Sequence, residues 1–232
     1  MTTLIAIETS TDLASVALHH GGCLSVQTTA GAVKHSQSVL PMIQQLLRDA
    51  KIDLNQCDAI AYGAGPGSFT GVRTACGIAQ GLAFGANLPV VAVSTLEAMA
   101  LACHDATGAI RVLPILDARM GEVYWAQFDF SVEPVTVTSP RLSSPTLVLQ
   151  KGEVIACGNG LLAYAAEFRH LNFYKTARAD LMPHAVQIAQ LGLRAFISGQ
   201  SVTACDAQPI YLRNQVALTT AERLQKKLQV GV

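Results

Sequence analysis

The chain has 232 residues, and its sixteen basic and sixteen acidic side chains cancel to a formal net charge of zero. A neutral chain lacks the summed field that attracts polyphosphate, which disfavours direct nucleic-acid binding. Half of the residues are hydrophobic and only 14% are charged, a ratio typical of a packed globular protein and not of a disordered one.

We expect no export signal, because MTTLIAIETS runs directly into a strand pattern without a basic segment or cleavage site. We therefore expect a cytoplasmic protein. The charge-free stretch 74–96 is about long enough to cross a bilayer, but Gly85 and Pro89 interrupt it. It reads better as a helix, a turn and a buried strand. The six cysteines are too dispersed for a zinc or dithiol site: Cys23, Cys57, Cys76, Cys103, Cys157 and Cys205.

The first predicted element is a β-hairpin. The apolar run 4–7 ends in the polar turn 8–12, after which residues 14–19 alternate like a half-buried strand. Glu8 stands at the end of the first strand.

The next strand, 58–63, leads into the glycine loop YGAGPGSFTGVR at 62–73. The loop lacks the lysine of a Walker motif and the third glycine of a Rossmann motif. A helix begins near Ser68, which can serve as an ordinary N-cap. Alternatively, its free amides contact a nucleotide or another anion, with these residues contributing: Glu8, Thr9, Ser10, Gly67 and Ser68.

Two helices in this half carry the main interface prediction. Residues 39–50 form an apolar stripe at helical spacing, and the helix 72–84 is apolar nearly all round. Gly77 and Gly81 each destabilise a helix by about 1 kcal/mol relative to alanine, which suggests that another backbone comes close. These two helices are covered either by the chain's own core or by a partner protein. The residues predicted to contact a partner are His35, Val39, Ile43, Arg73, Gly77, Gln80, Gly81 and Phe84.

The second half repeats the pattern of the first. A strand at 112–116 ends at Asp117, a second strand spans 122–128, and a strand and glycine turn at 153–160 lead into a helix at 161–168. Residues 131–145 are rich in proline, serine and threonine, which indicates extended edge strands and loops. A repeat of roughly a hundred residues predicts a duplicated α/β protein with one sheet in each lobe.

No catalytic site stands out in the sequence. Glu8 and Asp117 both end strands, so they could hold a metal-bound nucleotide between the lobes, or they could cap the amides of their turns. His35 is the best metal candidate, but Val39 stands where a second histidine would be needed, and we expect no metal site. Ser68 lacks the glycine flanks of a nucleophile elbow.

Several strings together resemble one family, the bacterial TsaB (YeaZ) proteins. They are IETS at 7–10, HS at 35–36, GPGSFTGVR at 65–73, DAR at 117–119 with EVY at 122–124, and PIYLR at 209–213. The resemblance covers essentially the whole chain. It implies a duplicated actin and Hsp70-like (ASKHA) fold with an N-terminal lobe at 1–103, a C-terminal lobe at 104–208, and a segment 209–232 that packs back on the N-terminal lobe.

The resemblance also implies a function in making N6-threonylcarbamoyladenosine at position 37 of tRNAs that read codons beginning with A. In that family TsaD transfers the threonylcarbamoyl group from threonylcarbamoyl-AMP and holds a metal, and TsaE is an ATPase that joins the complex. TsaB is implied to be a cofactor-free, non-catalytic partner that pairs with TsaD through its N-terminal lobe, forms a homodimer when alone, and meets tRNA only through the complex. The alternative is an independent nucleotide hydrolase or metallopeptidase of the same fold.

Overall fold

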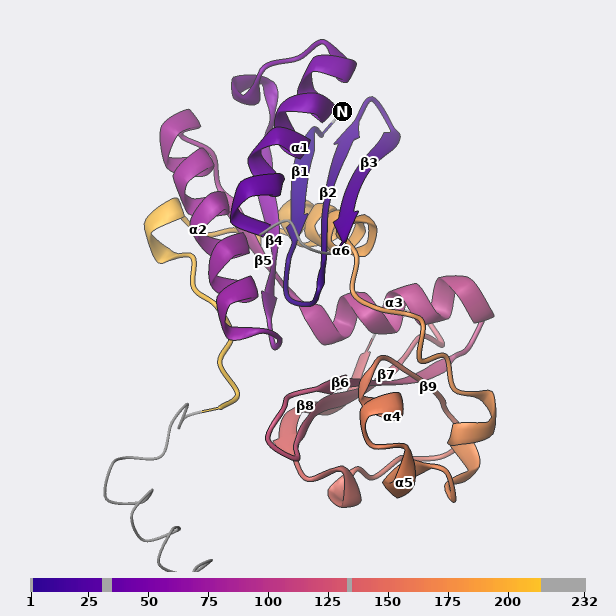
Figure 1. Cartoon of the computed structure of the whole chain (residues 1–232). Helices are drawn as coiled ribbons and strands as arrows, with labels where there is room; N and C mark the ends of the chain where they lie inside the picture. The colour runs from indigo at the N-terminus through magenta and orange to yellow at the C-terminus, as the bar shows by residue number, and fades with distance from the viewer. Residues whose placement is uncertain (1, 31–34, 133–134, 214–232) are drawn as a thin grey trace, which may run out of the picture.

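A computed structural model describes residues 2–30, 35–132 and 135–213 of the chain, which form two sheets with helices around them (Figure 1). The first sheet contains β1 (Leu4–Glu8), β2 (Leu13–His20), β3 (Cys23–Ala30), β4 (Ala59–Gly65) and β5 (Val90–Ser94). The second contains β6 (Arg111–Asp117), β7 (Val123–Asp129), β8 (Val135–Ser143) and β9 (Ile155–Cys157).

The helices are α1 (His35–Ala50), α2 (Phe69–Ala86), α3 (Thr95–Thr107), α4 (Gly160–Ala163), α5 (Ala165–Phe168) and α6 (Ala185–Ile197). Short 3₁₀ turns are η1 (Leu54–Gln56), η2 (Pro145–Leu147), η3 (Asn172–Thr176) and η4 (Ala204–Asp206). The helix predicted over 161–168 is thus divided into α4 and α5. Helix α6 was not predicted.

Four strands of the first sheet and the four strands of the second have the same topology, which confirms the predicted duplication. Their strand orders are β3-β2-β1-β4-β5 and β8-β7-β6-β9. In each, the first two strands in the chain pair antiparallel, and the first also pairs in parallel with the fourth. The fold is the duplicated ASKHA arrangement that the resemblance implied.

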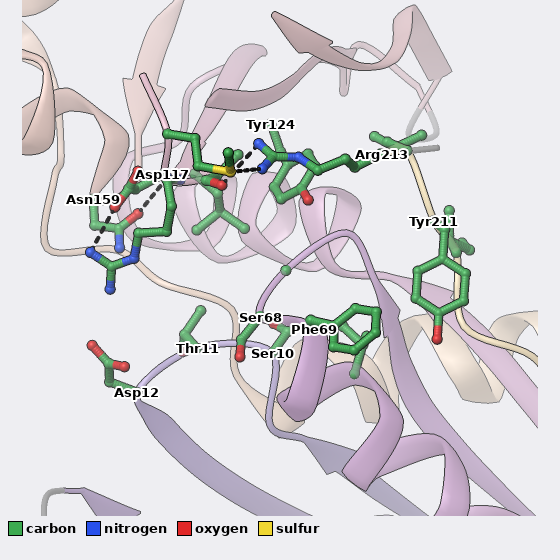
Figure 2. Close-up of a pocket in the computed structure, with 18 residues that line it drawn as sticks. Ser10, Thr11, Asp12, Ser68, Phe69, Asp117, Tyr124, Asn159, Tyr211 and Arg213 are labelled. Carbon is green, nitrogen blue, oxygen red and sulfur yellow. Dashed lines mark hydrogen bonds and ion pairs between the residues drawn. The ribbon is translucent and has the colours of Figure 1, made fainter. Parts of the chain in front are cut away.

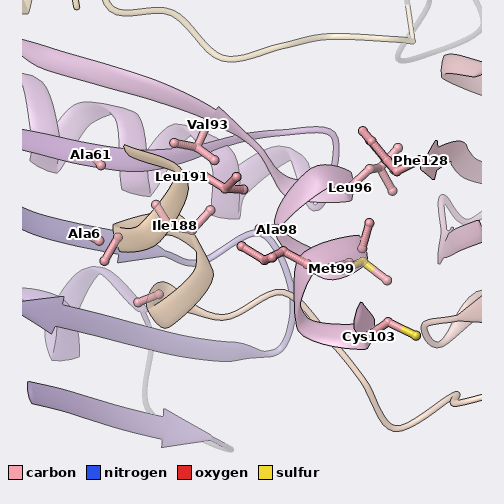
Figure 3. Packing of buried hydrophobic residues seen from close by; sticks show 14 of the residues in the cluster. Ala6, Ala61, Val93, Leu96, Ala98, Met99, Cys103, Phe128, Ile188 and Leu191 are labelled. Atoms are coloured by element: carbon pink, nitrogen blue, oxygen red, sulfur yellow. The ribbon is translucent and has the colours of Figure 1, made fainter. Parts of the chain in front are cut away.

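Side-chain alternation along the strands builds three apolar layers. On β1, Ile5 and Ile7 face α1 and α2, whereas Leu4 and Ala6 face α6. Helix α3 lies between the two sheets, and its Leu96 and Met99 join one buried cluster with Phe128 of β7 (Figure 3). The far side of the second sheet packs on α4, α5 and η3.

The packing differs from the predicted division into lobes at two places. The boundary at residue 103 falls inside α3, and α6, which lies within 104–208, packs on β1 and β4 of the first sheet. Ile210 and Tyr211 lie against the first lobe, where the Ile210 amide donates to the Ala64 carbonyl at 2.7 Å and the Tyr211 hydroxyl accepts from Arg73. The rest of the predicted C-terminal segment, 214–232, is outside the described residues.

The charge-free stretch 74–96 contains most of α2, a turn, β5 and the first residues of α3. Within the part of the chain that the structure describes, no helix combines the length and apolarity that a bilayer crossing requires.

Candidate functional site

The glycine loop packs directly against the β1–β2 turn. The Ser68 amide donates to the Ser10 carbonyl at 2.8 Å, and the Thr9 hydroxyl donates to the Gly71 carbonyl at 2.7 Å. A Cβ atom at Gly71 would overlap the Thr9 carbonyl. Glycine is therefore required at this position because two backbones touch.

Ser68 begins helix α2 as its N-cap, as predicted. Its hydroxyl accepts a hydrogen bond from the Gly71 amide at 3.4 Å, which satisfies one of the free donors of the first turn. Anion binding at this helix start stays a prediction.

The C-terminal part of α2 presents an uncovered face. Gly77 and Gly81 are exposed, and a Cβ atom added at either would have nothing within 4 Å. Phe84 follows with 74% of its surface exposed, and Arg73 is also exposed. We call Arg73, Gly77, Gly81 and Phe84 the open face of α2. Gly85, four residues after Gly81, is equally unobstructed and was not singled out in the sequence.

Two predicted partner contacts on α1 are instead part of the chain's own core. Val39 is fully buried and Ile43 is 3% exposed, both packed toward the first sheet. The apolar stripe of α1 was correctly located, but it faces inward, since a helix on a sheet buries its most apolar side. The outward neighbour Leu40 is 42% exposed and is the better candidate for a contact.

The remaining predicted contacts, His35 and Gln80, bond within the chain. His35 Nε2 donates to the Asp12 carbonyl at 3.3 Å, which ties the start of α1 to the β1–β2 turn. The Gln80 amide donates to the Ala207 carbonyl at 3.0 Å. Gln80 is half-buried by that segment, so it lies at the border of the open face and not in its centre.

A cleft of about 350 Å³ separates the two lobes (Figure 2). It lies between the β1–β2 turn, the start of α2, the β6–β7 turn and residues 210–213. Of the predicted anion-contact residues, Ser10, Gly67 and Ser68 line it. Glu8 and Thr9 are fully buried and do not.

The charged side chains of the second-lobe wall are mutually paired. Arg119 lies 3.1 Å from the Asp117 carboxylate, and Arg213 lies 2.6 Å from the Glu122 carboxylate. The Arg119 amide and the Tyr164 hydroxyl also donate to Asp117, at 2.8 and 3.0 Å. These carboxylates are therefore already neutralised and hydrogen-bonded within the wall, and Asp117 caps its turn as one sequence interpretation proposed.

Glu8 also caps its turn, but its carboxyl is buried away from water. The Ser10 amide donates to its Oε1 at 2.5 Å. Burial raises the pKa of the Glu8 carboxyl above its usual range, and the hydrogen bond from Ser10 opposes this only in part. Glu8 lies beneath the cleft while Asp117 lines it, so the structure does not bring the two acids together in one cavity.

In residues 2–30, 35–132 and 135–213, no group of three or more His, Cys, Asp or Glu side chains is arranged to hold a metal ion. His35 has the Asp12 carbonyl as its neighbour. Within the described residues, the site therefore combines an uncovered face on α2 with a cleft whose second-lobe charges are paired.

Comparison with known proteins gives consistent matches. The family model described as "TsaD: tRNA N6-adenosine threonylcarbamoyltransferase" matches residues 29–150. The tRNA threonylcarbamoyladenosine biosynthesis protein TsaB of Escherichia coli (strain K12) is 38% identical over 92% of this chain and 96% of its own. The namesake from Haemophilus influenzae is 38% identical over 92% and 94%. The solved structure of YeaZ from Pseudomonas aeruginosa, also 38% identical, superposes with a TM-score of 0.85 over 91% of this chain and 100% of its own.

Proposed function

We propose, because the chain belongs to the TsaB family of tRNA threonylcarbamoyladenosine biosynthesis proteins, that it is the non-catalytic partner of TsaD. With TsaD and TsaE, it supports transfer of the threonylcarbamoyl group from threonylcarbamoyl-AMP to N6 of adenosine 37. The open face of α2 docks on TsaD, and this chain meets tRNA only through the complex. The complex acts in the cytoplasm and this subunit needs no cofactor of its own.

The observation that carries this proposal is the empty space beside Gly77 and Gly81. Both lie inside a helix, neither has a left-handed φ, and neither is close to any other part of the described chain. A glycine inside a helix destabilises it by about 0.5–1 kcal/mol relative to alanine. Since nothing in the described part of the chain explains these glycines, a second backbone that packs on this helix is the physical reason we assign.

The side chains around these glycines suit a protein partner. Phe84, 74% exposed, provides an apolar anchor, and Leu40 of α1 adds a second one at 42% exposure. Aromatic anchors and a core depleted of charge are typical of protein interfaces. Arg73 supplies the one cation of the open face. In the absence of TsaD, the same face of a second copy would close a symmetric homodimer.

The state of the charged groups in and beneath the cleft supports a non-catalytic role. Burial favours the neutral form of Glu8, and a neutral carboxyl is a poor metal ligand or general base. Arg119 and Arg213 are both engaged by carboxylates of the same wall. This chain therefore contributes docking geometry to the complex, and TsaD contributes the reacting groups.

The docking surface is tested with Gly81→Arg, which places a long cation where we expect a helix crossing. The substitution meets open space in the chain, so the variant should fold normally by circular dichroism. We expect its affinity for TsaD, measured by calorimetry, to fall at least 100-fold. Gln190→Arg is the matched control, because it adds the same charge at an exposed position of α6, on the other side of the first sheet. Unchanged TsaD affinity of Gly81→Arg would refute the assignment of this face.

The function itself is tested by reconstitution of tRNA modification with TsaD and TsaE held constant. We expect modification only when this chain is added, and no modification by this chain without TsaD. Calorimetry of the chain alone with ATP and Mg²⁺ separates the alternative, because tight binding together with turnover would support an independent nucleotide hydrolase.

A further inference from the structure

We propose that Ala207–Arg213 forms a strap that couples the open face of α2 to the second lobe across the mouth of the cleft. The strap runs along the flank of α2 and ends on the β6–β7 turn (Figure 2). This inference rests on the proposed function, because it states how docking on α2 reaches the second lobe.

The first part of the strap is fixed to the first lobe by its backbone. The Ala207 carbonyl accepts hydrogen bonds from Gln80 at 3.0 Å and from the Cys76 thiol at 3.6 Å. The Tyr62 hydroxyl donates to the Gln208 carbonyl at 2.8 Å, and Ile210 pairs with Ala64 as described above. Four contacts within four residues leave this part of the strap little freedom to slide.

Tyr211 connects the strap to the open face. Arg73 Nε donates to the Tyr211 hydroxyl at 2.7 Å, and the guanidinium lies 3.5 Å from the centre of the Phe69 ring. Phe69 and Tyr211 are 42% and 45% exposed. A cation held between partly exposed rings gains stability when water is excluded. A protein that covers Arg73 therefore also fixes Tyr211.

Arg213 fixes the end of the strap to the second lobe. Its side chain is 15% exposed, and Nη2 donates to the Glu122 carboxylate at 2.6 Å and to the Ala118 carbonyl at 3.1 Å. Nη1 contacts the Met120 sulfur at 2.9 Å. Charge-assisted bonds of this kind are about twice as strong as neutral ones. The guanidinium thus holds three points of the β6–β7 turn.

The turn that Arg213 holds is conformationally strained. Arg119 and Met120 have φ values of 61° and 56°, in the left-handed region that non-glycine residues rarely adopt. Arg213 Nε is buried without an acceptor in the described chain, and such a donor favours any rearrangement that supplies one. Because the turn is strained and Arg213 Nε lacks an acceptor in the described chain, the contact between Arg213 and the β6–β7 turn can adopt a second arrangement.

The coupling is tested by hydrogen exchange of the full-length chain with Arg213→Met, which removes the guanidinium but keeps an unbranched side chain. We expect the amides of residues 118–122 and of Gln208, Ile210, Tyr211 and Leu212 to exchange at least tenfold faster than in the wild type. Arg169→Met, an exposed arginine of the second lobe away from the strap, should change neither segment. If Arg213→Met fails to fold, Glu122→Gln removes the carboxylate alone and should give the same pattern with a smaller change.

The second measurement adds TsaD to the wild-type chain. We expect protection of residues 118–122 in addition to α2, and a five- to tenfold weaker TsaD affinity for Arg213→Met although Arg213 lies outside the open face. Exchange of 118–122 that is unaffected by both the substitution and TsaD would overturn the strap. A wild-type chain that does not bind TsaD would overturn the proposed function, while faster exchange in Arg213→Met would still support the strap.

Discussion

The two halves of helix α2 use glycine for opposite reasons. At its start, Gly71 touches the Thr9 carbonyl, so the absence of a side chain lets the β1–β2 turn pack against the helix. Further along, Gly77 and Gly81 have open space around them. A glycine that is filled by the chain's own backbone serves folding. One that faces empty space weakens the helix without any compensating contact in the described residues, which is the basis of the proposed contact with a second protein.

The largest expected effect is on the packed half. Gly71→Ala places a methyl group against the Thr9 backbone, which cannot move aside as a flexible side chain could. We expect the free energy of unfolding to fall by about 3 kcal/mol, at the upper end for overpacked sites. Urea unfolding followed by circular dichroism measures it. A loss below 1 kcal/mol would show that this approach is not tight and would remove the contrast within α2.

The next effect extends the comparison to α1. Val39→Ala deletes two methyl groups from a fully buried position, so we expect a loss of about 2 kcal/mol in unfolding free energy. Leu40→Ala, at its half-exposed neighbour, should change stability by less than about 0.5 kcal/mol but weaken TsaD binding. If instead Val39→Ala weakened TsaD binding and left stability unchanged, Val39 would be a partner contact as the sequence predicted.

A smaller effect, of opposite sign, is expected in the open half. Gly81→Ala should raise the free energy of unfolding by about 0.5–1 kcal/mol, because alanine is the better helix former and its Cβ has no described atom within 4 Å. The same substitution should weaken TsaD binding measurably. Gly77→Ala is expected to behave alike. Stabilisation without any loss of affinity would mean that no backbone approaches this face.

The smallest effect concerns Glu8, whose carboxyl packs against Gly63. Burial raises its pKa in the folded chain above the unfolded value of 4.5, so its contribution to stability is complete below pH 4.5 and is lost as pH rises through the folded pKa. We expect the difference in unfolding free energy between wild type and Glu8→Gln to move against the wild type as pH increases. A pH-independent difference would show that folding leaves the pKa of Glu8 unchanged.

Local sequence signals predicted most of the elements. The hairpin at 4–19, the strand and glycine loop at 58–73, and the N-cap at Ser68 all rest on short-range patterns, and the structure contains each of them. The duplication was also visible, because each half repeats the same strand order. Glu8 and Asp117 were identified as turn residues, and their amide bonds confirm that interpretation.

The site was less accessible from sequence. Val39 and Ile43 share a helix face with other apolar residues, but periodicity does not say whether that face meets the chain's own sheet or a partner. Residues 207–213 carry no periodic pattern, although Tyr211 and Arg213 connect α2 to the second lobe. Gly85 could have been found by extending the four-residue spacing of Gly77 and Gly81.

The sequence by itself indicated most of the strands and helices and the plan that the two halves share, because capping, turn chemistry and side-chain alternation act over a few residues. Only the tertiary structure decided that α6 returns to the first sheet, that α1 turns its apolar stripe inward, and that one side of α2 is left uncovered. Those outcomes depend on which distant segments compete to bury the same surface, and the local sequence around each element does not determine the result of that competition.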